Sequence, residues 1–350
     1  MKIVHFAPFA PNASGMYEAA RDMVVADYKA GHDVLLVDVG SIAENGNKSE
    51  AKAGQEDLRG DTTIVTATPN AALSADVLVF HTGVPDNWVV KTQAPIIFVM
   101  HGRPTACFYT EHTGKKVSFS LINEIGQWPR VKAMVTFWPY HLNFWKSVIP
   151  KNKLTCLNAP PIDEARFSSK GMVYDLGGKS GKYNIVLADQ WRDDVNMYEI
   201  LNGAILASER IKGMKFHIFT LPNPLPRCWE LLTDRLKERD ALGVMWHRRT
   251  NMEEVYRAVD LVLSPQRIAT RSVAEPLSCG TPVIAANGCD FATYQTDTSD
   301  PEQVAKTIET AINNLKADSH AVKDKVTSVA SEFSLSKYSS YMNKVYEYVV

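Results

Sequence analysis

The segment from residue 256 to residue 286 constrains the fold of this chain more than any other stretch. A short apolar strand at residues 261–264 leads through a loop to a helix that carries Glu275. The helix stops at Gly280, and a second buried strand follows at residues 283–285. This order predicts a right-handed βαβ unit. Because open α/β sheets bind ligands beyond the carboxyl ends of their strands, Glu275 is a candidate binding residue.

The remainder of the chain repeats this alternation of buried strands and amphipathic helices. A length of 350 residues exceeds one ordinary hydrophobic core and favours two domains. We predict an N-terminal domain at residues 1–168, a linker at 169–183, a C-terminal domain at 184–334 and a final helix at 335–350 that packs back toward the N-terminal domain. The predicted strands are residues 2–7, 33–38, 63–66, 77–81, 96–100, 133–138 and 154–157, and then 184–188, 215–220, 244–246, 261–264 and 283–285.

Composition points to a reduced cytoplasmic protein without a membrane span. The chain has 22% charged residues and a net charge of −1, and it contains no apolar run near the roughly 18 to 20 residues that a span requires. The N-terminus also lacks the long apolar core of a signal peptide. Its 5 cysteines are odd in number and scattered, which favours packing thiols over disulfides or a zinc site.

Charge is unevenly distributed along the N-terminal domain. Residues 1–86 contain 6 Lys and Arg against 12 Asp and Glu, whereas residues 87–170 contain 11 against 4. Solvated surface explains this surplus, and so does a basic surface for an anionic polymer. The aromatic and basic segment at residues 137–153 likewise fits either a packed helix with a basic end or a nucleic-acid surface.

Three features of the N-terminal domain are candidates for function. Gly15 begins a helix after a Pro- and Asn-rich loop, where it either lets a phosphate or sugar approach free N–H groups or eases a tight turn. His81 and His101 each end a predicted strand and open a Gly- and Pro-containing loop, as expected for structural residues or for a site. Residues 41–60 are polar and aperiodic, and we interpret them as a surface excursion.

Taken together, these motifs resemble the GT-B glycosyltransferases, most closely their GT4-like group. The family's helix-closing Gly-His is similar to residues 31–32, and its domain exit is similar to Asn158 through Asp163 with Phe167. Its motif of paired glutamates, Tyr, Ala-Asp and Pro is similar to residues 253–265. Its E-A-M-A-C-G-x-P-V-I-A motif is similar to residues 275–285, and this match is the most specific.

The resemblance implies two doubly wound Rossmann-like domains facing across a cleft, with a sugar nucleotide, UDP-linked in our prediction, bound by the second domain. Glu275 would accept hydrogen bonds from the donor ribose, and Arg192 would hold the diphosphate with the help of the helix N-terminus. His101 would contact the reacting sugar. No metal is expected, because GT-B enzymes generally work without one. The backbone at Trp246, His247 and Arg248 would hold the base, and the predicted donor-binding residues further include Gly15, Arg267 and Arg271.

Departures from the family pattern leave other interpretations open. The family's paired acids lie eight residues apart, but Arg267 stands eight residues before Glu275. Trp191-Arg192, and His101-Gly102-Arg103 in place of an Asp-x-Arg, are similar to phage glucosyltransferases that modify hydroxymethylated DNA. His101 and Arg103 are therefore the candidate catalytic residues. The acceptor is a glycan, a small molecule or modified DNA; a non-catalytic nucleotide-binding module and a sugar-nucleotide epimerase are the alternatives.

Overall fold

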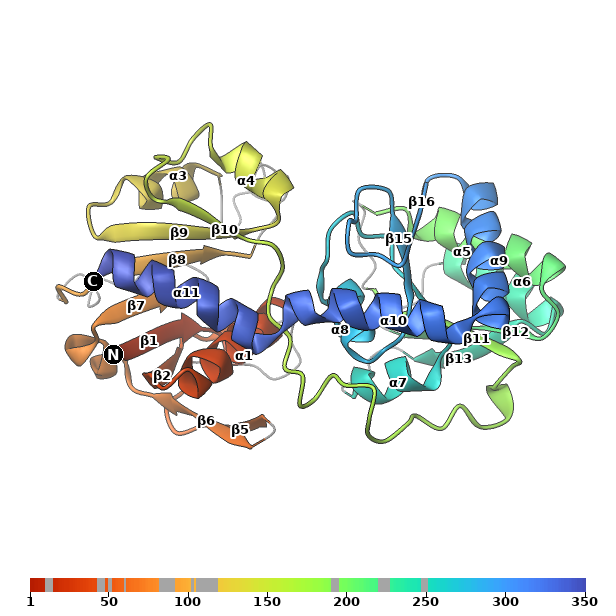
Figure 1. Ribbon diagram of the computed structural model, residues 1–350, viewed down its shortest axis with the longest axis horizontal. Coiled ribbons are helices and arrows are strands. Elements are labelled where there is room, and N and C mark those ends of the chain that lie inside the picture. Colours follow the sequence, from red (N-terminus) through yellow and green to blue (C-terminus); the bar gives the residue numbers. More distant parts are fainter. Residues whose placement is uncertain are drawn as a thin grey trace. The chain divides into compact units, whose positions relative to one another are not determined.

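The structure is a computed structural model that describes residues 1–9, 15–42, 48–49, 52–59, 61–81, 92–101, 104, 119–189, 195–219, 227–246 and 251–350. Its internal contacts divide the chain into two compact units (Figure 1). Unit 1 comprises Met1–Asp163 together with Ser334–Val350, and unit 2 comprises Glu164–Phe333. The terminal segment after residue 333 therefore belongs to the same unit as the N-terminus.

Unit 1 is built on a mainly parallel sheet. Among the described residues its strand order is β10-β9-β8-β7-β1-β2-β6-β5, and only the pairing of β5 with β6 is antiparallel. Most of these strands are continuous apolar runs, as expected where helices cover both faces of a parallel sheet. Their bounds are β1 Lys2–Ala7, β2 Asp33–Asp38, β5 Glu56–Arg59, β6 Thr62–Ala67, β7 Val77–Phe80, β8 Ile96–Met100, β9 Val131–Phe137 and β10 Leu154–Leu157.

Helices lie on both faces of this sheet. Helices α3 (Phe119–Gln127) and α4 (Pro139–Trp145) pack on the face that carries Phe6, Phe80 and Phe98, and the indole of Trp145 is fully buried there. Helices α1 (Gly15–Lys29) and α11 (Leu335–Val349) contact each other on the opposite face. Helix α1 ends at Lys29, two residues before Gly31, whose φ of 87° lies in the left-handed region and confirms the predicted glycine stop.

The part of residues 41–60 whose exposure the structure describes is mostly at the surface, as expected, but the segment contains strands that the sequence did not predict. Strands β3 (Ser41–Ile42) and β4 (Lys48–Ser49) pair with each other, and β5 joins the edge of the main sheet. A network of charged side chains attaches β5 to α1. The Arg59 guanidinium on β5 donates to the Glu18 carboxylate on α1 at 2.6 Å, and Arg21 Nε lies 3.0 Å from Asp57 Oδ2. These ion pairs hold the polar strand against α1.

Unit 2 contains a fully parallel sheet of six strands among the described residues. Its order is β13-β12-β11-β14-β15-β16. In chain order this is 3-2-1-4-5-6, so the direction of winding reverses between β11 and β14. The bounds are β11 Tyr183–Leu187, β12 Met214–Phe219, β13 Leu242–Trp246, β14 Leu261–Leu263, β15 Val283–Ala286 and β16 Tyr294–Thr296.

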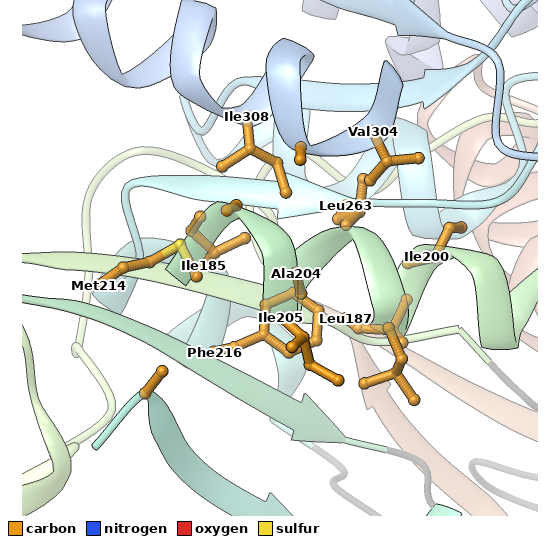
Figure 2. Close-up of a cluster of buried hydrophobic side chains, with 14 of the residues drawn as sticks. Ile185, Leu187, Ile200, Ala204, Ile205, Met214, Phe216, Leu263, Val304 and Ile308 are labelled. Carbon is orange, nitrogen blue, oxygen red and sulfur yellow. The ribbon is translucent and has the colours of Figure 1, made fainter. Parts of the chain in front are cut away.

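One face of the unit 2 sheet is covered by α5 (Met197–Arg210), α6 (Arg227–Glu238) and α9 (Pro301–Ala317). Figure 2 shows Ile200 and Ala204 of α5 packed with Val304 and Ile308 of α9 over the strands. The N-cap of α9 is Asp300, whose carboxylate accepts hydrogen bonds from the backbone N–H groups of residues 302 and 303. Helices α7 (Met252–Ala258), α8 (Arg271–Ser278) and α10 (Ser319–Ala330) complete the unit.

The two Rossmann-like units confirm the predicted α/β fold class. The four cysteines that the structure describes are free thiols. No helix in the described part of the chain is long and apolar enough to cross a membrane.

Candidate functional site

The site in unit 2 lies where the strand order reverses. Asp189 follows the carboxyl end of β11, and Ser264 and Gln266 follow the carboxyl end of the neighbouring strand β14. The loop continues through the N-cap residue Thr270 into α8. Ligands of doubly wound folds bind at this kind of reversal, because the loops after the two central strands diverge there and leave a crevice.

A buried carboxylate organises this edge of the sheet. Asp189 Oδ2 accepts hydrogen bonds from the Ser264 hydroxyl at 2.9 Å and the Ser272 hydroxyl at 2.6 Å. Its other oxygen, Oδ1, accepts from the Gln266 side-chain amide at 3.0 Å. Asp189, Ser264 and Gln266 are all buried. The carboxylate therefore fixes the β14–α8 loop and the first turn of α8 against the end of β11.

Helix α8 carries two of the predicted residues on one face. Arg271 in its first turn donates from Nε to Glu275 Oε1 at 2.6 Å, and both residues are 8% exposed. Residues four apart share a helix face, and a buried arginine and carboxylate require each other because an unpaired buried charge is costly. Burial, followed by the negative charge of Glu275, raises the pKa of the adjacent Tyr256 well above its ordinary value.

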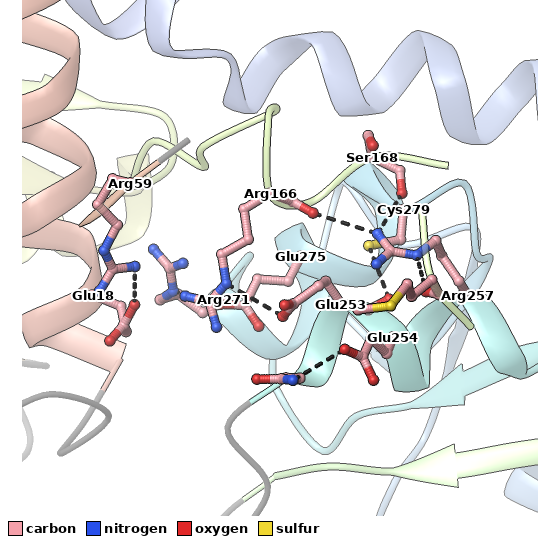
Figure 3. A network of polar contacts seen from close by, with 12 residues as sticks. Glu18, Arg59, Arg166, Ser168, Glu253, Glu254, Arg257, Arg271, Glu275 and Cys279 are labelled. Atoms are coloured by element: carbon pink, nitrogen blue, oxygen red, sulfur yellow. Dashed lines mark hydrogen bonds and ion pairs between the residues drawn. The ribbon is translucent and has the colours of Figure 1, made fainter. Parts of the chain in front are cut away.

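Figure 3 shows further charged residues of unit 2 that lie near α8. Arg166 Nε donates to Glu253 Oε2 at 3.2 Å, and the guanidinium groups of both Arg166 and Arg271 lie over the ring of Phe167. Arg257 donates to the backbone carbonyls of residues 166, 168 and 172, which anchors the start of unit 2 to α7. The segment after the domain exit is thereby attached to the βαβ unit.

The predicted site residues other than His101 fall into four groups. Arg271 and Glu275 are brought together on α8. Trp246 ends β13 and is 54% exposed, and Arg267 is an exposed residue of the β14–α8 loop. In unit 1, Gly15 is the first residue of α1 and is exposed. Four predicted residues lie outside the described part of the chain: Arg103, Arg192, His247 and Arg248.

The carboxyl edge of the unit 1 sheet holds a row of three hydrogen-bonded histidines. His101 follows β8, and its Nε2 lies 2.9 Å from Nδ1 of His81, which follows β7. His81 Nε2 lies 2.9 Å from Nδ1 of His5 on β1, and His5 Nε2 lies 3.0 Å from Oδ2 of Asp27 on α1. The ring of His101 also contacts Phe137 at the end of β9, with a centroid distance of 5.2 Å.

Burial controls the protonation of this row. It lowers the pKa of His101 to about 3. Burial, and then the neighbouring His101 and His5, lower the pKa of His81 well below its ordinary value. Both imidazoles are therefore neutral at neutral pH. A neutral imidazole has one N–H donor and one acceptor nitrogen, so each link of the row holds one proton.

Sequence reasoning missed the partners of these residues. It found His81 and His101 at strand ends but not His5 or Asp27, and it found Glu275 but not Asp189. A signal was present in each case, because His5 and Asp189 are polar residues within or directly after continuous buried runs. A polar residue in such a position requires a hydrogen-bond partner.

Comparison with known proteins gives similarity in structure alone. No family model matches the chain, and no curated protein matches its sequence. HepE from Anabaena, solved with UDP and glucose, has a TM-score of 0.68 at 10% identity, with 99% of each chain covered. A glycosyltransferase from Rickettsia africae has a TM-score of 0.66 at 12% identity, covering 99% of this chain and 98% of its own. An alpha-glucosyltransferase solved with UDP has a TM-score of 0.63 at 12% identity, covering 100% and 99%.

These similarities extend over both units, and each unit has a parallel sheet whose winding reverses beside its first strand. At such low identities they establish the architecture, and the predicted GT-B architecture is thereby confirmed. This protein has the two-domain GT-B fold of glycosyltransferases.

Proposed function

We propose that this protein is a glycosyltransferase that moves a sugar from a nucleotide-sugar donor, UDP-linked in our proposal, to an acceptor hydroxyl. Unit 2 binds the donor, and unit 1 supplies the acceptor side together with His101, which contacts the reacting sugar. The similar structures of HepE and of the alpha-glucosyltransferase were both solved with UDP, which supports this choice of nucleotide.

The observation that carries the proposal is the polar site at the strand reversal of unit 2. There the first turn of α8 presents backbone N–H groups next to the buried pair of Arg271 and Glu275. A helix N-terminus carries a partial positive charge that attracts phosphate, and a carboxylate accepts from the two adjacent hydroxyls of a ribose. One short helix thus combines the chemistry required by both parts of a nucleoside diphosphate.

The leaving diphosphate requires positive charge in addition to the helix terminus. We assign this role to Arg192, in the segment that follows β11, and Arg271 supports it by orienting Glu275. Stabilisation by arginine and backbone N–H groups makes a divalent metal unnecessary for departure of the diphosphate. We therefore expect the rate of sugar transfer to stay unchanged in the presence of excess chelator.

Nucleotide binding is the first test. UDP and UDP-sugars should raise the melting temperature of the protein, because a ligand that binds only the folded state stabilises it by about 2.7 kcal/mol at 100 times its dissociation constant. ADP and GDP serve as comparisons for the base. If no nucleoside diphosphate or nucleotide sugar shifts the melting temperature or is hydrolysed, the proposed function is wrong.

Two variants test the assignment of residues. Arg192→Ala should abolish stabilisation by UDP, and Glu275→Gln should reduce it, since the amide loses the negative charge and one acceptor oxygen. Glu238→Gln is the matched control, because Glu238 lies in the same unit but pairs with Arg235 on the exposed surface of α6. Full stabilisation of both site variants by UDP would reject the assignment even if the protein transfers sugar.

A further inference from the structure

The row of histidines in unit 1 has a fixed geometric origin. Strands β1, β7 and β8 are neighbours in the sheet (Figure 1). His5 is paired in register with Val79, two residues before His81, and Phe80 is paired with Phe98, three residues before His101. Because strand side chains alternate between faces, all three imidazoles lie on the same face of the sheet. They form a diagonal that rises toward its carboxyl edge.

The inner end of the row is anchored by a carboxylate with two donors. Asp27 Oδ2 accepts from the Tyr346 hydroxyl of α11 at 2.6 Å and is 3.0 Å from His5 Nε2. Burial, and then the charge of Asp27, raise the pKa of the Tyr346 phenol well above its ordinary value, so this hydroxyl keeps its proton. Asp27, His5 and Tyr346 are all completely buried. If the Asp27 carboxylate is ionised it can only accept hydrogen bonds, and the proton in its hydrogen bond with His5 then lies on His5 Nε2.

That assignment determines every other proton in the row. If the His5 ring carries a single proton, on Nε2, its Nδ1 accepts a hydrogen bond from His81 Nε2–H. His81 Nδ1 then accepts a hydrogen bond from His101 Nε2–H. His101 is left with an unprotonated Nδ1. Among the described residues, the one hydrogen bond found for the His101 ring is that of Nε2.

We propose that Asp27, His5 and His81 are positioning residues that fix the tautomer of His101, so that its Nδ1 accepts a hydrogen bond from a substrate hydroxyl. The proposal rests on the proposed function, because it assigns a chemical role to the contact between His101 and the reacting sugar. It also selects the substrate group. A neutral imidazole with an acceptor at Nδ1 binds a hydroxyl, which donates, and repels a phosphate oxygen, which only accepts.

Nitrogen-15 NMR of the unliganded protein tests the tautomer without any assay of activity. Long-range proton–nitrogen spectra at pH 7 should show His5, His81 and His101 as Nε2–H tautomers, with peaks assigned by their loss in single variants. His217 is an internal reference, because the backbone N–H of residue 244 donates to its Nδ1 and leaves the proton on Nε2. An Nδ1–H tautomer of His101, as a protonated Asp27 would produce, overturns the proposal.

Removing His5, which connects the row to Asp27, should free the hydrogen bond between His81 and His101 to take either direction. In His5→Leu, the N–H group at His81 Nε2 loses its acceptor. The hydrogen bond between His81 and His101 can then reverse its direction, so both rings should shift toward the Nδ1–H form. His217→Leu removes a buried histidine of unit 2 and should leave the tautomers of the row unchanged. An unaltered His101 spectrum in folded His5→Leu would show that Asp27 does not set the tautomer.

Kinetics then test the hydroxyl contact. Asparagine places an acceptor oxygen near the position of Nδ1. The kcat/KM of His101→Asn should therefore be about tenfold higher than that of His101→Leu, because one neutral hydrogen bond contributes about that factor. In the His101→Leu background, His5→Leu should cause no further loss of kcat/KM. Equal activity of the asparagine and leucine variants would reject the acceptor role.

Binding measurements separate the two sources of the hydroxyl. If it belongs to the donor sugar, His101→Leu weakens binding of UDP-glucose but not of UDP; if it belongs to the acceptor, only transfer is affected. If the NMR spectra are as expected but the protein shows no activity, the proposed function is rejected and the tautomer assignment holds. The two proposals therefore fail by different observations.

Discussion

The buried carboxylate of Asp189 offers the sharpest test of how the unit 2 site is built. In Asp189→Ala the hydroxyls of Ser264 and Ser272 and the amide of Gln266 all lose their acceptor. Ser264 is 0% exposed and Gln266 is 1% exposed, so water does not readily take the place of the lost carboxylate. Each hydrogen bond to a charged group contributes about 1.5–3 kcal/mol, and relaxation around the vacancy recovers part of that. We expect a loss of about 3–5 kcal/mol.

Asp189→Asn should cost far less, about 1 kcal/mol. The two serine hydroxyls meet at Oδ2, and an amide oxygen in that place still accepts from both. Gln266 meets the other oxygen, Oδ1, and rotation of its terminal amide presents a carbonyl to the new NH₂ group. The asparagine variant then loses mainly the charge of the original acceptor.

Calorimetry is the appropriate assay, since a two-unit protein need not unfold in one step. For a unit of this size each kcal/mol shifts the melting temperature by about 2–4 °C, so the alanine variant should melt about 6–20 °C lower. Hydrogen exchange of residues 261–286 should increase in the same variant. Asp300→Ala is the control, because it removes an N-cap worth about 1 kcal/mol from the same unit. An alanine variant at position 189 no less stable than this control would refute the reasoning.

Three further predictions follow from packing and burial. Gly203→Ala should cost about 1–3 kcal/mol of unfolding free energy, because the new Cβ would lie 2.5 Å from a side-chain atom of α9, whereas Gly178→Ala meets nothing within 4 Å. Calorimetry of the two variants checks the difference. Burial raises the pKa of Cys279 to about 12, so its thiol should resist Ellman's reagent at pH 8 until the protein unfolds. Burial likewise lowers the pKa of His101 to about 3 and that of His217 to about 4. Since the unfolded histidines bind protons near pH 6.5, stability should fall as the pH drops from about 6.5 toward 4, and thermal unfolding at pH 7 and pH 5 measures this.

The sheets were predictable because buried parallel strands are continuous apolar runs. Strand β7 is an example, because its bounds Val77–Phe80 agree with the predicted strand at residues 77–81 to within one residue. Strand β5 was not predictable, because its sequence EDLR is charged and the buried Arg59 pairs with Glu18, 41 residues away, as well as with Asp57. Helix α10 was missed since few of its side chains are buried, so its apolar periodicity is weak.

The site could be predicted in part for the same reason. The βαβ unit around Glu275 is local in sequence, so spacing alone places the acid on a helix that follows a strand. Asp189 bonds to residues 75 and 83 positions away, and His5 bonds to residues 22 and 76 positions away. Such partners meet only because particular strands are neighbours in the sheet, and that order is a property of the folded topology.

The two sheet edges handle charge in opposite ways, and this difference fits the two halves of a nucleotide sugar. In unit 2 the carboxylate of Asp189 accepts hydrogen bonds from three side chains, and the N-terminus of α8 carries a partial positive charge that attracts an anion. In unit 1 burial keeps His101 neutral, although an imidazolium would also attract phosphate. A charged His101 would lose its acceptor nitrogen and would bind anions in the unit that we propose handles neutral hydroxyls. In our proposal a neutral His101 therefore keeps its acceptor nitrogen for a hydroxyl, and the row of histidines gives the neutral ring a defined polarity.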